Sequence, residues 1–261
     1  MVTGGSKGLG LACAEEMLKL GAMVVLTARG AADLNKVQAV LNVEHPGRIF
    51  SVVADLSGPS GRETAVAKLV ELWGPDARLD VLVNNVGTNK RKRVDEVDAN
   101  EYHMMVATNQ DSAFFMCKLC FPMLCRSSHA SIVNVSSLAG LRSTGTGVPY
   151  AMTKAAMTHM TKALACEWAR HRIRVNCVAP WMARTPLLEE ATRNDPTATQ
   201  AAQEATPLNR LGEPNDTSGA VAFLCMPAAA YVTGQVIAVD GGIAAQGFCG
   251  PCSRKTESSV G

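Results

Sequence analysis

The chain of 261 residues carries a formal net charge of +2, with 47% hydrophobic and 18% charged residues. This composition indicates a globular protein with a large apolar core and excludes a disordered chain. The near-neutral charge gives no reason to expect a nucleic-acid partner, and the apolar runs fall short of the ~18–20 residues that a membrane span requires, so we expect neither nucleic acid nor a membrane as partner.

Short apolar runs alternate along the chain with longer stretches in which apolar residues recur at helical spacing. The short runs are typical of strands buried on both faces of a parallel sheet. Their alternation with helices predicts right-handed βαβ units, and so a Rossmann-type doubly wound parallel α/β sheet of about seven strands with helices on both faces, in a single domain over residues 1–248. The expected strands are 22–28, 48–54, 79–85, 130–137, 173–180 and 234–240, and the expected helices are 9–20, 31–43, 61–73, 100–125, 150–170 and 214–225.

A glycine-rich loop stands at the start of the chain, where the sequence reads TGGSKGLG over residues 3–10. Glycines allow a tight turn and a close approach of the backbone to a pyrophosphate, and the helix that follows directs its N-terminus at that charge. Because the loop opens a helix within a βαβ unit, it predicts a dinucleotide cofactor. The residues expected to bind it here are Gly4, Ser6, Lys7, Gly8, Leu9 and Gly10.

The strand that should lead into this loop is short in the sequence. Only Met1 to Thr3 precede the first glycine, whereas strands usually run about 5–6 residues. Losing three or four buried aliphatic residues would cost on the order of 5–12 kcal/mol. We therefore expect a truncated first strand, and our hypothesis is that a misplaced start or an incomplete transcript has shortened the chain.

The end of the second expected strand bears on the choice of nucleotide. It reads Thr27-Ala28-Arg29-Gly30, with no acidic residue until Asp33. An acidic residue would bind the ribose hydroxyls of NAD, whereas an arginine accommodates the 2′-phosphate of NADP. Arg29, with Lys7 in the glycine loop, therefore favours NADP(H) over NAD(H). The alternative is that Arg29 is a solvated residue after a strand.

The strongest chemical signal is Tyr150-Ala-Met-Thr-Lys154. Residues four apart on a helix share one face, so the phenol and the ammonium are neighbours. A cation about 4 Å from the phenol is worth about 4 kcal/mol at an effective dielectric near 20. Together with an oxidised nicotinamide, Lys154 could bring the pKa of Tyr150 from about 10 toward about 7. Ser137, at the end of an expected strand, Asn109 and the Asn-Asn-Val-Gly stretch at 84–87 strengthen the signal.

The cysteines and the last residues complete the survey. The chain has nine cysteines, which we expect to be reduced thiols in a cytoplasmic protein, because a domain of this size does not depend on disulfides. Cys249 and Cys252 have redox or metal spacing, but no second pair of ligands accompanies them, and no metal site is predicted. Residues 249–261 are expected to form a disordered tail.

The motifs, in their order and spacing, resemble the short-chain dehydrogenase/reductase family over about residues 1–248. They are TGGSKGLG, Asp55-Leu56, NNVG, Asn109, SS-LAG, YAMTK, VNCVAP and VDGG. Within that family, the stretches 164–180, 184–187, 211–214 and 223–235 are similar to the tropinone reductase group.

The resemblance implies roles for residues at matching positions. Tyr150 would be the general acid for ketone reduction, and Ser137 would donate a hydrogen bond to the substrate carbonyl oxygen. Lys154 would bind the nicotinamide ribose and lower the pKa of Tyr150, while Asn109 would hold a water in the proton relay. Asp55 would meet the adenine, Asn85 and Gly87 the adenosine ribose, and Thr185 the nicotinamide carboxamide, with Leu56 and Pro180 as further cofactor residues.

The substrate end is expected over residues 181–212, a proline-interrupted stretch that follows a strand at the edge where doubly wound folds bind ligands. It is expected to form a lid. Trp181 replaces a glycine that most relatives have, and either packs the lid or forms a wall of the pocket. The expected pocket residues are Ser137, Tyr150, Trp181 and Leu187.

Charges near this end are few. Arg142 in loop 138–149 and the basic cluster at 90–93 are expected in solvent. No strong anchor for an anionic substrate is therefore predicted, while Glu189 or Glu190 could meet an amine. The expected substrate is a small, cyclic or bulky, mainly apolar ketone, or the corresponding secondary alcohol.

Three functions remain open at this point. The first is an NADPH-dependent carbonyl reductase. A 3-oxoacyl-carrier-protein reductase would share every catalytic residue, and the basic cluster at 90–93 would suit its acidic carrier. A catalytically idle NADP-binding scaffold would not need these side chains. The resemblance also implies a homodimer or homotetramer assembled through helices 100–125 and 150–170.

Overall fold

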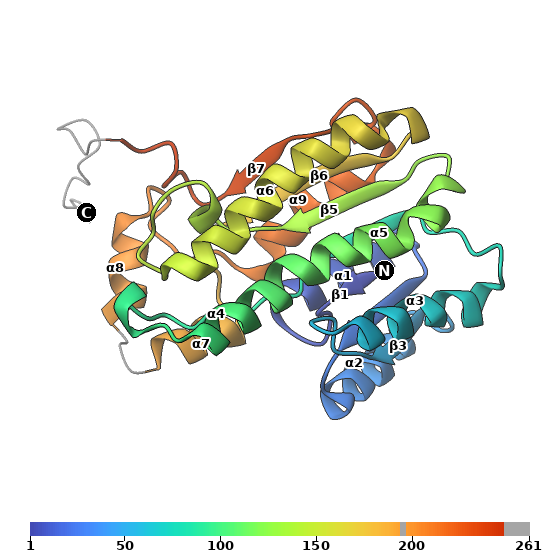
Figure 1. Ribbon diagram of the computed structural model, residues 1–261, viewed down its shortest axis with the longest axis horizontal. Coiled ribbons are helices and arrows are strands. Elements are labelled where there is room, and N and C mark those ends of the chain that lie inside the picture. The colour runs from blue at the N-terminus through green and yellow to red at the C-terminus, as the bar shows by residue number, and fades with distance from the viewer. Residues whose placement is uncertain (194–196, 248–261) are drawn as a thin grey trace, which may run out of the picture.

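The computed structural model describes residues 1–193 and 197–247, and these form one parallel sheet with helices on both faces (Figure 1). The strands follow the order β3-β2-β1-β4-β5-β6-β7 across the sheet, and every neighbouring pair is parallel. This confirms the predicted Rossmann-type doubly wound fold. The strands are β1 (Val2–Thr3), β2 (Val24–Ala28), β3 (Ile49–Val53), β4 (Val81–Asn84), β5 (Ser131–Val135), β6 (Arg174–Pro180) and β7 (Val236–Val239).

Each face of the sheet is covered by its own set of helices. One set is α1 (Gly8–Lys19), α2 (Ala31–Glu44) and α9 (Pro214–Cys225), and the other is α3 (Pro59–Trp73), α5 (Ser112–Cys125) and α6 (Val148–Trp168). The predicted helix 100–125 is interrupted. It consists of α4 (Ala99–Val106), a π-helical turn (Ala107–Asp111) and α5. The stretch expected as a lid contains α7 (Pro186–Thr192) and α8 (Thr197–Ala205).

The first strand is as short as predicted, yet it occupies the centre of the sheet. Val2 pairs with Leu26 of β2 and with Val83 of β4. Beyond this backbone pairing, the side chain of Thr3 links β1 to the residues after β4. Its hydroxyl accepts hydrogen bonds from the backbone N–H groups of Asn85 (2.9 Å) and Val86 (3.2 Å). Thr3 thereby fixes the loop that follows β4.

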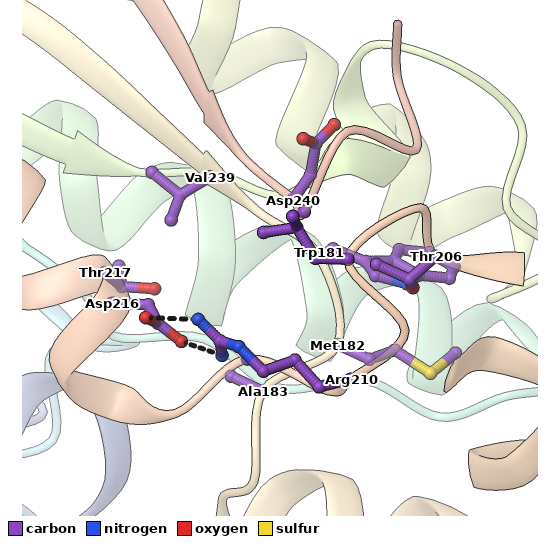
Figure 2. Close-up of a pocket in the computed structure, with 12 residues that line it drawn as sticks. Trp181, Met182, Ala183, Thr206, Arg210, Asp216, Thr217, Val239 and Asp240 are labelled. Carbon is purple, nitrogen blue, oxygen red and sulfur yellow. Dashed lines mark hydrogen bonds and ion pairs between the residues drawn. The ribbon is translucent and has the colours of Figure 1, made fainter. Parts of the chain in front are cut away.

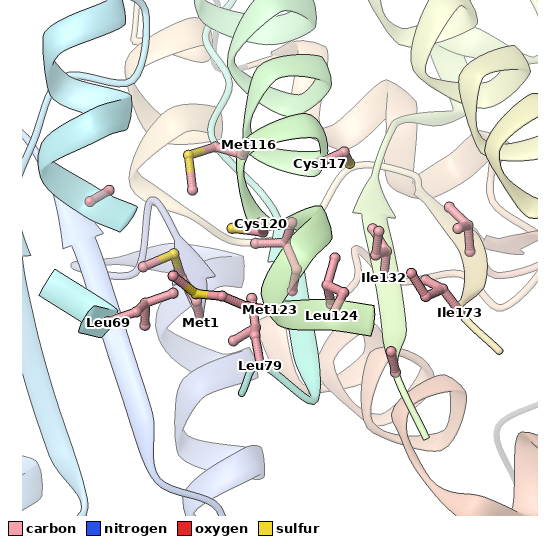
Figure 3. Close-up of a cluster of buried hydrophobic side chains, with 14 of the residues drawn as sticks. Met1, Leu69, Leu79, Met116, Cys117, Cys120, Met123, Leu124, Ile132 and Ile173 are labelled. Atoms are coloured by element: carbon pink, nitrogen blue, oxygen red, sulfur yellow. The ribbon is translucent and has the colours of Figure 1, made fainter. Parts of the chain in front are cut away.

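Two apolar clusters hold the layers together, one on each face of the sheet. Figure 3 shows the cluster beneath α3 and α5, where the side chains of Met1, Met116, Cys120 and Ile132 converge. On the opposite face, residues of α1, α2 and α9 pack on β2, β4 and β5. Each fully buried aliphatic or aromatic side chain contributes about 1.5–3 kcal/mol relative to exposure.

The cysteines that the structure describes are all free thiols, and Cys125 and Cys166 are the exposed ones among them. Burial raises the pKa of Cys13, Cys117 and Cys120 to about 12, so these thiols stay protonated. Within the described ranges, no helix is long and apolar enough to cross a membrane, and no three metal-ligating side chains gather. Cys249, Cys252 and the tail expected at 249–261 lie outside the described residues.

Candidate active site

The glycine loop joins β1 to α1 and has room only for glycine at its critical points. Gly4 has a φ of +64°, which L-residues with a side chain rarely adopt. A Cβ on Gly10 would overlap the carbonyl oxygen of Gly4 and the side-chain amide of Asn85. That amide donates to the carbonyl oxygens of Thr3 (3.0 Å) and Gly4 (3.1 Å). The loop is therefore a preformed turn, with the N-terminus of α1 open to an anion.

At the end of β2, Arg29 lies near the start of the loop after β3. Burial acts to raise the pKa of the Asp55 carboxyl, but hydrogen bonds from Ser57 and the charge of Arg29 together hold it below its ordinary value. The Asp55 carboxylate accepts from the Ser57 backbone N–H at 3.0 Å and from its hydroxyl at 2.8 Å. Leu56 is buried. Exposed Arg29 and Lys7 leave two cations at this end of the sheet's carboxyl edge.

Lys154 is buried on α6 at 3% exposure. Its ammonium donates to the carbonyl oxygen of Val135 at 2.9 Å and lies 5.8 Å from the centre of the Tyr150 ring. Burial lowers its pKa to about 8. A Cβ on Gly87 would come within 3.2 Å of this ammonium, so glycine at that position keeps one side of it clear. The ammonium therefore has space beside it for a further acceptor.

Tyr150 faces the same pocket as Ser137. Burial raises the pKa of the Tyr150 phenol, and the Ser137 hydroxyl and the positive charge of Arg91 oppose that rise. Sequence reasoning assigned the pKa-lowering charge to Lys154. In the structure the ammonium of Lys154 donates to the Val135 carbonyl, 5.8 Å from the centre of the Tyr150 ring, and its effect on the phenol beside a bound nicotinamide stays a prediction.

Asn109 occupies the π-helical turn and is completely buried. Its Oδ1 accepts from the Thr88 N–H at 2.7 Å. Its Nδ2 donates to the Thr88 carbonyl at 2.9 Å and to the Thr153 hydroxyl at 3.1 Å. Every polar atom of the amide has a partner, so the side chain ties α6 to the loop after β4.

A cavity of about 110 Å³ brings most of the expected chemistry together. Ser137, Tyr150 and Leu188 of α7 are among the residues that line it. Thr185 lies at the N-cap of α7, where its hydroxyl accepts from the Leu188 N–H at 3.3 Å. The expected residues that line this cavity are Leu9, Ser137, Tyr150, Pro180, Trp181, Thr185 and Leu187. The expected adenosine-side residues, among them Arg29, Asp55 and Asn85, lie outside it.

Trp181 also lines a second cavity, which Figure 2 shows, and Met182 and Ala183 line both cavities with it. Its indole Nε1 donates to the Thr206 hydroxyl at 3.2 Å, and its ring packs against the small cluster of Leu188, Ala202 and Leu211. Trp181 therefore packs against the two helices of residues 181–212 and also lines the cavity of Ser137 and Tyr150, while its role in a substrate pocket stays a prediction. The guanidinium of Arg210 in the second cavity is paired with both oxygens of the Asp216 carboxylate, at 2.6 and 2.9 Å.

The side chains of the basic cluster at 90–93 point in two directions: three pair with carboxylates, and one lines the cavity. This division was not predicted from the sequence. Lys90 and Lys92 both pair with Glu101, at 3.2 and 2.7 Å, and Arg93 pairs with Asp95 at 3.2 Å. Arg91 lines the active-site cavity instead. The expectation of a wholly solvated cluster was therefore wrong for Arg91.

Comparison with known proteins covers nearly the whole chain. A family model described as enoyl-(acyl carrier protein) reductase matches residues 4–244. A chloroplastic tropinone reductase homolog of Arabidopsis thaliana is 40% identical over 248 residues, which are 95% of this chain and 76% of that protein. The matched ranges contain every residue of the cavity described above.

Two solved structures share the architecture. A short-chain dehydrogenase/reductase of the glucose/ribitol dehydrogenase type from Brucella melitensis has a TM-score of 0.85 and 37% identity, with 92% of this chain and 94% of that chain covered. A gluconate 5-dehydrogenase from Burkholderia cenocepacia, in complex with NADP and tartrate, has a TM-score of 0.86 and 27% identity, with 94% of this chain and 94% of that chain covered.

Proposed function

Because the chain belongs to the short-chain dehydrogenase/reductase family, whose members are oxidoreductases acting on CH–OH and C=O groups, we propose that it reduces a small, cyclic or bulky, ketone to a secondary alcohol with NADPH. The reaction is reversible. The observation that carries the proposal is the cavity in which the hydroxyls of Ser137 and Tyr150 stand together, with Lys154 one helical turn further along α6.

The proposed mechanism assigns one task to each polar side chain. A bound nicotinamide supplies or accepts the hydride. Ser137 orients the substrate by a hydrogen bond to its carbonyl oxygen, and Tyr150 donates the proton to that oxygen. Lys154 binds the nicotinamide ribose on the side that Gly87 leaves clear. Asn109 positions the loop after β4 and helix α6 relative to each other through its hydrogen bonds with Thr88 and Thr153.

The residues of the glycine loop fit a dinucleotide, since Gly10 and Gly4 leave no room for side chains between the loop and Asn85. The preference for NADP(H) over NAD(H) rests on Arg29 and Lys7, which are both exposed at the cofactor edge. A guanidinium beside an ammonium suits a 2′-phosphate. The related gluconate 5-dehydrogenase structure, a complex with NADP, adds support from a relative.

The lid is proposed to comprise residues 181–212, which include α7 and α8. Its Trp181 and Leu187, with Leu9 and Pro180 opposite, give the cavity an apolar wall. Such a wall suits a compact carbon skeleton such as a cyclic ketone.

A 3-oxoacyl-carrier-protein reductase is the second candidate, because the matching family model is named for an acyl-carrier-protein reductase. The basic cluster gives this candidate little help. Lys90, Lys92 and Arg93 are already paired with Glu101 and Asp95, so the positive field that would attract an acidic carrier is reduced.

The test is a panel of cyclic ketones and acetoacetyl thioesters. Turnover of each compound is measured from the loss of absorbance of NADPH and, in separate assays, of NADH. Turnover of cyclic ketones with NADPH supports the proposal, and faster turnover of the thioesters supports the second candidate. Binding of NADPH without turnover of any substrate contradicts both and leaves the idle scaffold.

Assembly and location are part of the proposal as well. The exposed apolar side chains Phe114 (45%), Phe115 (36%) and Met152 (51%) lie on α5 and α6 and support a homodimer or homotetramer. The free thiols support a reducing compartment, which we propose to be the cytoplasm, although one relative is named as chloroplastic. Light scattering of the purified protein and a fluorescent fusion in cells test the two points.

A further inference from the structure

The Arg91 side chain stands apart from the other cations of its segment. Lys90, Lys92 and Arg93 each have a carboxylate partner within 3.2 Å. For Arg91, by contrast, no hydrogen bond or ion pair to another described residue is found, and its Nε is closed off from solvent. A buried hydrogen-bond donor on a charged group is costly unless it is paired. Arg91 lines the cavity of Ser137 and Tyr150, and its charge acts on the Tyr150 phenol, so the guanidinium lies at this cavity.

A second unpaired atom lies beside it. The Nδ2 of Asn89 donates to the carbonyl oxygen of Thr146 at 3.0 Å, which fixes the orientation of the amide. Its Oδ1 is buried and lacks a donor among the residues that the structure describes. Asn89 lines the same cavity. One segment of chain therefore brings a guanidinium and an amide, each with an unpaired buried atom, to the lining of one cavity.

The rest of the cavity contains nothing that could neutralise Arg91. Its described lining carries the hydroxyls of Ser136, Ser137, Thr144, Thr146 and others, apolar side chains, and no carboxylate. The four carboxylates that follow Arg91 most closely in the sequence have other partners: Asp95 pairs with Arg93, and Glu101 pairs with the two lysines. Glu96 accepts from the Arg93 N–H, and Asp98 accepts from the Glu101 N–H. A planar guanidinium matches the two oxygens of a carboxylate better than any single acceptor.

We propose that Arg91 and Asn89 form a subsite for the carboxylate end of the substrate, so that the ketone reduced by this chain is a keto acid. The Arg91 guanidinium binds the carboxylate, and Asn89 Oδ1 accepts from a hydroxyl or amide group of the same molecule. The inference rests on the proposed reductase function and names its substrate class. It replaces the expectation, made from the sequence, of a substrate without an anionic group.

The alternative is that Arg91 serves only to act on Tyr150, whose pKa its charge helps to lower. In that case Arg91 would matter equally for charged and neutral ketones. A pair of substrates that differ in charge alone separates the two possibilities. We choose 4-oxocyclohexanecarboxylate and its methyl ester, which share a ring and a ketone.

The experiment measures kcat/KM for both compounds with NADPH in wild type, Arg91→Gln, Arg91→Lys and Arg93→Gln. Arg93 is the matched control, since it lies in the same segment and its guanidinium is exposed and paired with Asp95. We expect wild type to prefer the acid. Arg91→Gln should lower kcat/KM for the acid about 10- to 100-fold and for the ester less than about 3-fold. Arg91→Lys keeps the positive charge but not the planar pair of donors, so its kcat/KM for the acid should lie between those of wild type and Arg91→Gln. Arg93→Gln should leave kcat/KM unchanged for both compounds.

Equal losses for acid and ester in Arg91→Gln, or a wild type without preference for the acid, would overturn the inference while leaving the reductase function intact. If neither ketone is reduced, the proposed function fails on its own. Calorimetry then decides the subsite separately, with 4-hydroxycyclohexanecarboxylate titrated into enzyme saturated with NADP⁺. Binding that is lost in Arg91→Gln supports the subsite, and an absence of binding to wild type refutes it. Melting curves of each variant establish that it is folded.

Discussion

Asn109 and Thr88 hold each other through two hydrogen bonds, one in each direction between the amide side chain and the backbone. The Thr88 N–H donates to Asn109 Oδ1 at 2.7 Å, and Asn109 Nδ2 donates to the Thr88 carbonyl at 2.9 Å. This pairing fastens the π-helical turn between α4 and α5 to the segment that carries Asn89 and Arg91. The third bond, to Thr153, reaches the residue next to Lys154.

Replacing Asn109 with alanine should therefore destabilise the folded chain and weaken the positioning of the segment after β4. Thr88 would lose the partners of both its backbone groups in a buried place, which costs about 2–4 kcal/mol of unfolding free energy. We expect a matching loss in urea denaturation and a fall in kcat. Asn100→Ala, at the exposed start of α4, is the control and should stay within about 0.5 kcal/mol of wild type. Unchanged stability of Asn109→Ala would remove the positioning role.

Replacing Tyr150 with phenylalanine should remove the proton donor while leaving the cavity its shape. We expect kcat to fall about 10²- to 10⁴-fold and the affinity for NADPH, measured by fluorescence titration, to remain the same. Tyr231→Phe is the matched control, because that side chain is fully exposed. Undiminished turnover in Tyr150→Phe would refute the assignment of the general acid.

Lys154→Met should make the protein more stable at neutral pH and inactive. Burial lowers the pKa of Lys154 from 10.5 to about 8 in the folded chain. At a pH where Lys154 is protonated in both the folded and the unfolded chain, this shift corresponds to about 3 kcal/mol of destabilisation. The lost bond to the Val135 carbonyl offsets about 1 kcal/mol of this gain.

The sign of the pH dependence follows from the direction of that shift. Below about pH 8 wild type bears the full cost of the buried charge. The cost declines as pH rises from about 8 to 10.5, because the folded chain releases its proton first. The advantage of Lys154→Met should shrink over that window in urea denaturation at pH 7 and pH 10. Lys162→Met, exposed on the same helix, should show no such trend, and an advantage independent of pH would contradict the argument.

Arg29→Ser should weaken NADPH selectively. Loss of the guanidinium removes charge-assisted bonds to a 2′-phosphate, each worth about 1.5–3 kcal/mol, so we expect KM for NADPH to rise about 10- to 100-fold. NADH lacks that phosphate, and its KM in the same variant serves as the internal control. Equal changes for the two cofactors would show that Arg29 does not read the phosphate.

Trp181 offers a graded pair of variants. Trp181→Phe removes the bond to Thr206 and keeps a ring in the wall, whereas Trp181→Ala removes the ring that lines both cavities. We expect Trp181→Ala to raise kcat/KM for ketones with bulky substituents relative to cyclohexanone, and Trp181→Phe to keep the wild-type ranking. An unchanged ranking in Trp181→Ala would show that the tryptophan only packs the lid.

The periodicity of apolar residues was sufficient to predict the fold, because parallel strands buried on both faces leave a continuous apolar run. The predicted run 130–137 contains β5, every residue of which is buried. The π-helical turn at 107–111 was not predictable in this way, since one extra residue in a helix hardly disturbs the apolar spacing. Its Asn109, however, was found through the family resemblance.

The two lid helices and the direction of Arg91 depended on contacts between distant segments. Alanine-rich α8 has little apolar signal of its own and buries Ala202 in a cluster with Leu188 and Leu211, against which Trp181 and Met182 pack. Four adjacent cations in a polar stretch predict solvent exposure, and nothing local distinguishes the second of them, Arg91, from its neighbours. Asn89 is held by Thr146, 57 positions away, and that contact sets which side of the segment faces inward.

The alternation along residues 89–92 makes substrate choice a matter of chain length as well as of side-chain type. Asn89 and Arg91 point into the cavity, and Lys90 and Lys92 point outward to Glu101. Deleting or inserting one residue between Gly87 and Asn89 would exchange the two rows, so that a lysine entered the cavity and the arginine reached solvent. Relatives of equal composition but different spacing in this segment should therefore differ in the charge of the ketone they accept.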